Sequence, residues 1–189
     1  DRVFSPKGIG TVVTGTVLGK KCELDEKIFI SQNQKETKIK NIQVHNQNAI
    51  EANISSRAAL NLQGVNISQI NKGDLITKKG HIRGFDGIDI SFKCLKGKKL
   101  NHNQTYSLFI GAKKIEVKVL LFDCITNLEE GFATIKANEN LYTIFGEKIL
   151  LRNANDTICG GIVLNPIIDP MKKNQKRNLL EALNKKDFT

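Results

Sequence analysis

The 189-residue chain contains no tryptophan and only two tyrosines. It therefore lacks the aromatic surfaces on which proteins that bind single-stranded nucleic acids stack successive bases. No stretch approaches the roughly 18 consecutive apolar residues of a membrane-spanning helix. Asp1 and Arg2 lead directly into a strand pattern and do not resemble the start of a signal peptide. These absences predict a cytoplasmic protein with no membrane partner.

Recognisable metal and catalytic motifs are also missing. The four cysteines lie far apart without a CxxC pair, and the three histidines show no ligand spacing, so we expect no metal site and a reducing compartment. Gly19-Lys20-Lys21 cannot close a P-loop, because Thr14 stands where the first glycine belongs and no Ser or Thr follows the lysine. We therefore predict a binding protein that is not an enzyme and holds no cofactor.

Positive charge is abundant. Lysine and arginine outnumber aspartate and glutamate by 29 to 19, which gives a formal net charge of +10. Such an excess favours an anionic partner, most often nucleic acid contacted through its phosphates. A lysine-coated surface that serves only solubility is the alternative.

Short alternating patterns fill the chain up to about residue 165. Apolar and polar residues alternate at 88–94, 115–121 and 60–63, which is typical of strands with one buried face. Further strands are expected at 11–18, 27–31, 37–45, 105–111, 132–137, 148–152 and 157–164. About a dozen short strands without intervening helices indicate barrels or sandwiches.

The predicted fold class is all-β, with two tandem antiparallel β-barrels and a short C-terminal helix. A break near Lys78-Lys79-Gly80 divides the barrels, so we expect domains at 1–78 and 79–170, followed by a helical segment at 171–189. The segment 73–76 reads as the closing strand of the first barrel. Asp169-Pro170 provides a helix cap and a proline for the first helical position, ahead of a lysine-rich helix at 171–186.

The segment 3–17 reads VFSPKGIGTVVTGTV, with glycines among β-branched residues. Glycine weakens a strand unless the backbone bends sharply, as a long strand does at the corner of a small barrel, so we assign these glycines an architectural role. The segment closely resembles the opening of domain II in translational GTPases such as elongation factor Tu. This resemblance implies that residues 80–170 form domain III.

Within that superfamily, the segments DRVF at 1–4, IQVHN at 42–46, RAALNLQGV at 57–65 and GGIVLNP at 160–166 resemble selenocysteine-specific elongation factors (SelB). The resemblance implies that the chain is a fragment that binds the aminoacyl end of selenocysteyl-tRNA for delivery to the ribosome. Asp1, Arg2 and Arg57 would hold the selenocysteyl group, and Gln43 and His45 would lie near the 3′ end of the tRNA. Lys113, Lys114 and Lys118 are candidates for contacts with the tRNA stems.

The family also contains parts that this sequence does not show. GTP and magnesium would bind in a GTPase domain that precedes these residues, and an mRNA hairpin would bind winged-helix domains that follow them. Two alternatives to this interpretation stay open. The chain would be domains II and III of another translational GTPase of the elongation factor Tu type, or a free-standing basic β-barrel module that binds RNA or a protein.

Overall fold

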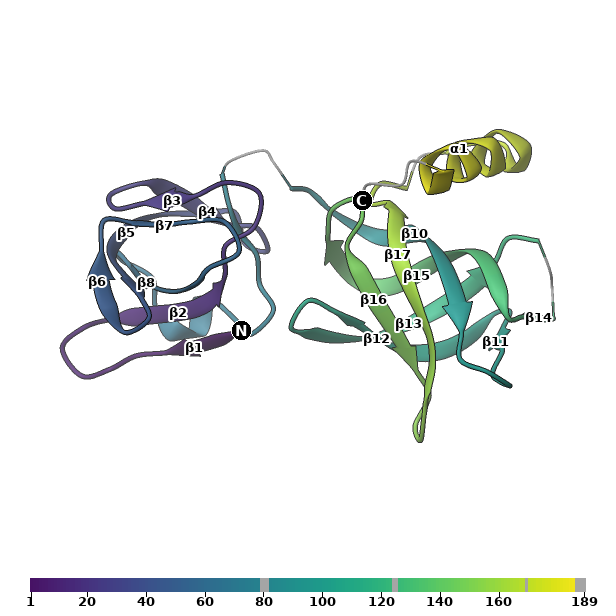
Figure 1. Cartoon of the computed structure of the whole chain (residues 1–189), viewed down its shortest axis with the longest axis horizontal. Coiled ribbons are helices and arrows are strands. Elements are labelled where there is room, and N and C mark those ends of the chain that lie inside the picture. The colour runs from purple at the N-terminus through teal and green to yellow at the C-terminus, as the bar shows by residue number, and fades with distance from the viewer. Residues whose placement is uncertain (79–81, 124–125, 169, 186–189) are drawn as a thin grey trace. The chain divides into compact units, whose positions relative to one another are not determined.

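The computed structural model describes residues 1–78, 82–123, 126–168 and 170–185. The chain divides into two compact units, Asp1–Ile82 (unit 1) and Arg83–Thr189 (unit 2). Figure 1 shows strands throughout both units and one α-helix near the C-terminus. The all-β class predicted from the alternating patterns is confirmed. The predicted boundary at 78/79 lies beside residues 79–81, which are outside the described residues.

Unit 1 is a curled antiparallel sheet with the strand order β1-β2-β8-β5-β4-β9, in which β6 also pairs with β5. A small pair, β3 with β7, and a 3₁₀ helix complete the unit. The elements are β1 (Arg2–Phe4), β2 (Thr11–Thr16), β3 (Cys22–Glu23), β4 (Lys27–Ile30), β5 (Lys35–Val44), β6 (Gln47–Ala49), β7 (Glu51–Ala52), β8 (Arg57–Leu62), η1 (Ile67–Gln69) and β9 (Ile76–Thr77).

Unit 2 is a closed barrel with the strand order β10-β15-β13-β12-β16-β17, beside a small pair, β11 with β14. Helix α1 (Lys173–Lys185) packs on β10 and β17 (Figure 1). The strands are β10 (Gly84–Cys94), β11 (Leu100–Asn101), β12 (Gln104–Ile110), β13 (Lys113–Leu121), β14 (Asn127–Leu128), β15 (Glu130–Tyr142), β16 (Lys148–Arg152) and β17 (Thr157–Asn165).

Period-two alternation builds both cores. In β13 the buried residues are every second one, from Ile115 to Leu121, and they join the barrel core together with Ile88, Ile90 and Leu151. Unit 1 buries the corresponding residues of β5, β8 and β4 around Ile39 and Ile42. Where the alternation is regular, as in β13, the outward face carries polar side chains, whereas β10 buries consecutive residues from Gly87 to Ile90.

Four details differ from the expectations. Unit 1 is a curled sheet, and only unit 2 closes fully. Gly8 and Gly10 lie in the loop between β1 and β2 with φ of +80° and +91°, so a left-handed backbone, and not a coiled strand, explains them. Gly73 is likewise in a turn, and the closing strand is only Ile76–Thr77. Helix α1 begins at Lys173, past the non-helical Pro170, and the predicted cap Asp169 is outside the described residues.

No helix within the described ranges is long and apolar enough to span a membrane.

Candidate functional site

The strand register of unit 1 brings most of the predicted site residues onto one face of the sheet. Arg2 pairs with Thr14, Thr14 with Ala59, Ala59 with Gln43, and Gln43 with Asn48. Directly paired residues of an antiparallel sheet point to the same face, so these five form a single row across β1, β2, β8, β5 and β6. Arg57 lies two residues from Ala59 on β8, and therefore on the same face.

The opposite face of these strands packs into the core. Val3 pairs with Val13, Val13 with Leu60, and Leu60 with Ile42, and all four belong to the apolar cluster of unit 1. A shift of one residue in any strand would exchange the two faces. The apolar row therefore fixes the outward direction of the row from Arg2 to Asn48. We call this outward surface, with Arg57 and its pairing partner Thr16, the polar face.

An ion pair dominates the polar face. Nη1 of Arg57 lies 2.5 Å from Oδ2 of Asp1, and the same Nη1 donates a long hydrogen bond of 3.4 Å to the hydroxyl of Thr16. The backbone nitrogen of Asp1 donates to the carbonyl oxygen of Thr14 at 2.7 Å, which holds Asp1 against β2. The side chains of Arg57 and Asp1 are 62% and 39% exposed, so water screens the pair and a ligand can reach it.

The second guanidinium of the polar face belongs to Arg2, which is exposed on the edge strand β1. Among the described residues, Arg2 has no ion-pair partner. The side chains of Arg2, Arg57 and Asp1 together carry a net charge of +1. The polar face has the charge and the access to attract a small anion.

Amide groups form the other end of the row. Nε2 of Gln43 and Nδ2 of Asn41 both donate to Oδ1 of Asn48, at 3.2 and 3.3 Å. These bonds are exposed, and they orient the Gln43 amide along the sheet surface. Asn48 was not among the predicted residues. Only its register opposite Gln43 on β6 identifies it.

His45 lies at the end of the polar face and not within it. His45 and Asn46 form the turn between β5 and β6, with φ of +52° and +62°. A concavity of about 440 Å³ adjoins this turn and is lined by His45, Asn48 and Ser56, among others. Ser56 directly precedes Arg57, so the concavity reaches the edge of the polar face.

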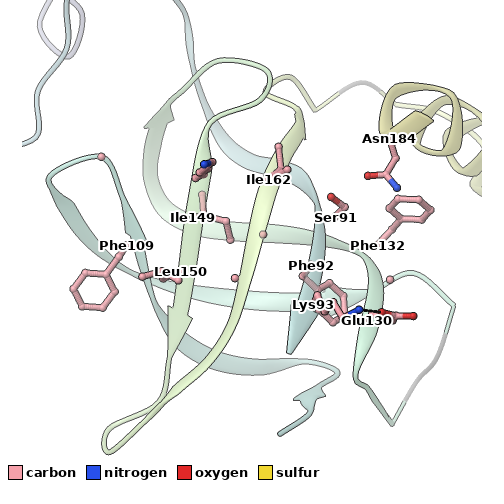
Figure 2. Close-up of a pocket in the computed structure, with 15 residues that line it drawn as sticks. Ser91, Phe92, Lys93, Phe109, Glu130, Phe132, Ile149, Leu150, Ile162 and Asn184 are labelled. Atoms are coloured by element: carbon pink, nitrogen blue, oxygen red, sulfur yellow. Dashed lines mark ion pairs between the residues drawn. The ribbon is translucent and has the colours of Figure 1, made fainter. Parts of the chain in front are cut away.

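Unit 2 has a larger concavity, of about 940 Å³, on the outer wall of its barrel (Figure 2). Phe109, Leu150 and Ile162 supply apolar side chains, and the backbones of Gly160 and Gly161 form part of its floor. A single ion pair lies at one edge, between Nζ of Lys93 and Oε2 of Glu130 at 3.3 Å. Ser91, Lys148 and Asn184 also line the concavity, so its lining mixes apolar and polar side chains.

Unit 2 also contains a buried polar cluster that the sequence reading missed. Asp89 is fully buried and accepts a hydrogen bond from the Thr134 hydroxyl at 2.6 Å. Nζ of Lys176, on α1, lies 2.8 Å from the same carboxylate, and this side chain is only 13% exposed. Asp89 alternates with apolar residues as an outward strand residue should, and it is buried because α1 covers that face.

Lysines gather on the wall formed by β12, β13 and β15. Lys118 and Lys136 stand directly opposite each other, an arrangement that costs free energy without a counter-anion. Nζ of Lys114 lies 5.9 Å from the ring centroid of Phe109. Lys113 is paired with Glu139 at 2.6 Å. The wall is therefore basic, and of the three lysines predicted to contact tRNA stems, Lys113 already has a carboxylate partner.

One class of metal site is absent from the described residues. Within them, no group of three or more His, Cys, Asp or Glu side chains could hold a metal. The sequence has no GxxxxGK[ST] loop to surround phosphates.

Three proteins that are similar to this chain are all selenocysteine-specific elongation factors. The chain is 27% identical over 183 residues to a selenocysteine-specific elongation factor of Desulfomicrobium baculatum, covering 93% of this chain and 29% of that protein. The corresponding protein of Haemophilus influenzae is 30% identical over 181 residues, covering 94% and 28%. That of Escherichia coli is 26% identical over 188 residues, covering 97% and 29%. The chain thus spans less than a third of the length of these relatives.

The fold has a counterpart among solved structures. The crystal structure of a bacterial selenocysteine-specific elongation factor, EF-Sec, matches 98% of this chain and 30% of its own length, with a TM-score of 0.80 and 23% identity. No family model matches the chain.

Proposed function

The chain is related over nearly all of its length to one segment of selenocysteine-specific elongation factors, and on that premise we propose that its polar face receives the aminoacyl end of selenocysteyl-tRNA. The observation that carries the proposal is the juxtaposition of Asp1, Arg2 and Arg57 on one exposed sheet face. On this proposal the chain is a binding segment of a translation factor that acts on the ribosome, in the cytoplasm.

The selenocysteyl group and the competing seryl group differ in charge. A selenol is largely ionised at neutral pH, whereas the serine carried by the precursor tRNA has a neutral hydroxyl. A guanidinium 4 Å from an anion contributes about 4 kcal/mol at an effective dielectric constant near 20, before desolvation is subtracted. Half of that would give about 30-fold discrimination against serine. Arginine suits this role because its charge does not depend on pH in the physiological range.

The three charged residues take different parts. Arg57 and Arg2 attract the selenolate, and Asp1 orients Arg57 through the ion pair at 2.5 Å. Asp1 is also available to accept from the α-amino group of the aminoacyl ester. Thr16 limits the freedom of the Arg57 side chain through the 3.4 Å hydrogen bond. A charged face organised in this way favours an anion with a neighbouring cation, which is the pattern of an ionised selenocysteyl group.

Other parts of the tRNA would meet other parts of the chain. The exposed amide of Gln43 and the imidazole of His45 lie along and beyond the row that contains Arg2, so they suit the terminal nucleotide of the 3′ end. The lysines of the unit 2 wall suit phosphates of the stems. GTP hydrolysis, with its magnesium ion, and mRNA hairpin binding are assigned to segments outside these residues.

The test compares selenocysteyl-tRNA with seryl-tRNA on the same tRNA body. The full-length gene product is titrated against each, and binding is followed as protection of the aminoacyl ester from hydrolysis. We expect tighter binding of selenocysteyl-tRNA by about 30-fold, and loss of most of that preference in Arg57→Gln. Arg57→Lys should retain part of it, because charge is kept while the planar fork is lost.

Arg177→Gln is the matched control. Arg177 is also an exposed, ion-paired arginine, 51% exposed and 3.1 Å from Asp123, but it lies on α1 of unit 2. This variant should keep the full preference. Equal affinity of the wild type for both tRNAs would refute the selenocysteyl site and favour general aminoacyl-tRNA binding. If Arg57→Gln kept the full preference for selenocysteyl-tRNA, Arg57 would not be part of the selenocysteyl site.

A further inference from the structure

Two cysteines of unit 2 face each other across the seam of the barrel. Cys94 on β10 is the register partner of Cys159 on β17. The neighbouring pair is joined by a hydrogen bond from the nitrogen of Leu95 to the carbonyl oxygen of Ile158, at 2.9 Å. The nitrogen of Cys94 points the other way, to the carbonyl oxygen of Glu129 at 2.7 Å. Cys94 and Cys159 are therefore a non-hydrogen-bonded pair of an antiparallel ladder.

This type of pair is the closer of the two in an antiparallel sheet. Its Cα atoms are about 4.5 Å apart and its side chains share one face. A disulfide spans Cα separations of about 4.4–6.8 Å, so the pair fits without moving the strands far. Sγ of Cys94 donates to the carbonyl oxygen of Leu128 at 3.7 Å.

The two thiols differ in their exposure to solvent. Cys159 is fully buried, whereas Cys94 is only partly buried at the margin of the barrel core. A reagent in solution therefore meets Cys94 first, and Cys159 is placed to react with whatever forms there. Cys22, in unit 1, is partly buried as well but is paired in register with Ala52, so it provides an internal reference thiol without a neighbour.

We propose that Cys94 and Cys159 are a modification site at which a low-molecular-weight disulfide such as oxidised glutathione forms a cross-strand bond between β10 and β17. The thiolate of Cys94 attacks one sulfur of the reagent, and the first small thiol leaves with its electron pair and takes up a proton. The thiolate of Cys159 then attacks Sγ of the mixed disulfide, and the second small thiol leaves in the same way. The two cysteines lose two electrons and two protons, and the reagent is reduced to two thiols.

Burial sets the rate of this reaction. Desolvation raises the pKa of the Cys94 thiol above its usual value, and desolvation together with the neighbouring Cys94 raises that of Cys159 further. Both groups are therefore protonated at neutral pH, and since only the thiolate reacts, the bond should form slowly and faster as pH rises. This is a site that responds to sustained oxidation and not to a brief pulse.

The test treats the chain with oxidised glutathione at pH 8, blocks remaining thiols, and maps tryptic peptides without reduction. Cleavage after Lys93, Lys96, Arg152 and Lys172 releases Cys94 and Cys159 in separate peptides, 94–96 and 153–172. We expect these two peptides to appear joined, with Cys22 carrying glutathione alone. The melting temperature of the barrel should rise by about 5–10 °C, because a disulfide constrains the unfolded chain.

Two variants keep the result interpretable. Cys159→Ser should leave glutathione on Cys94, because the second thiol is gone, and Cys94→Ser should abolish both the adduct and the joined peptide. Separate alkylation of Cys94 and Cys159, under conditions that convert Cys22 fully, would overturn the proposal. So would a joined peptide that contains Cys22 or Cys124 in place of either residue.

Discussion

The two units each contain a carboxylate paired with a basic side chain, yet they expose these pairs very differently. In unit 1, Arg57 and Asp1 are 62% and 39% exposed on an open sheet face. In unit 2, Lys176 of helix α1 and Asp89 of β10 are 13% and 0% exposed, where the helix packs on the barrel. An exposed pair contributes little to stability and exchanges partners easily. A buried pair is costly to break and fixes how its elements pack. The first is suited to binding and the second to architecture.

The largest expected effect comes from removing one partner of the buried pair. Lys176→Met leaves the Asp89 carboxylate without its counter-charge, so the free energy of unfolding should fall by about 3–5 kcal/mol. Both tyrosines of the chain, Tyr106 and Tyr142, lie in unit 2. Urea unfolding followed by tyrosine fluorescence therefore reports on unit 2. A loss under about 1 kcal/mol would mean that this pair behaves like a surface pair.

The double variant Asp89→Val/Lys176→Met separates charge from packing. An apolar pair of suitable shape is often as stable as a buried ion pair, so this variant should recover at least half of the loss. No recovery would show that the hydrogen bond from Thr134 and the amide of Asn165, 3.4 Å from Asp89, matter more than the charge.

A smaller loss of stability is expected when alanine replaces a glycine, and it should differ between β17 of unit 2 and β2 of unit 1. A Cβ on Gly161 of β17 would lie 2.5 Å from the carbonyl oxygen of Ser91, whereas one on Gly15 of β2 would meet nothing closer than 3.9 Å. Gly161→Ala should therefore lower the free energy of unfolding by about 1–3 kcal/mol. Gly15→Ala should change it by less than about 1 kcal/mol. Thermal unfolding checks both, and an equal response would contradict the difference in strand packing.

The smallest expected effect on stability is at the exposed pair. Arg57→Met should change the free energy of unfolding by no more than about 1 kcal/mol, because water already screens this pair. Circular dichroism during urea unfolding measures the change for both units together. A loss comparable to that of Lys176→Met would assign Arg57 an architectural role and weaken its assignment to ligand binding.

Much of the fold follows from the sequence because period two is a local property. The alternating runs at 88–94 and 115–121 were predicted as strands and lie within β10 and β13. Asp89 shows the limit of this reasoning. Its alternation predicts an outward side chain, but only the packing of α1 across β10 determines that this outward position is buried.

The residues of the candidate site were predicted from the sequence, but their arrangement was not. Asp1, Arg2 and Arg57 were singled out by resemblance to a family motif, since their spacing in the sequence carries no chemistry of its own. Their meeting on one surface depends on the register among β1, β2 and β8, which connects residues up to 56 positions apart in the sequence. Asn48 was missed because its contact with Gln43 arises from the turn at His45 and Asn46.

The central claim is that the polar face selects its ligand by charge. The most direct test measures the affinities of the full-length gene product for selenocysteyl-tRNA and seryl-tRNA across a range of pH that includes the pKa of the selenol. The preference should be full while the selenol is ionised and should disappear as pH falls and the selenol becomes neutral, with little change for seryl-tRNA. A preference that stays constant across this range would contradict selection by Arg2 and Arg57 and would indicate recognition by size or shape.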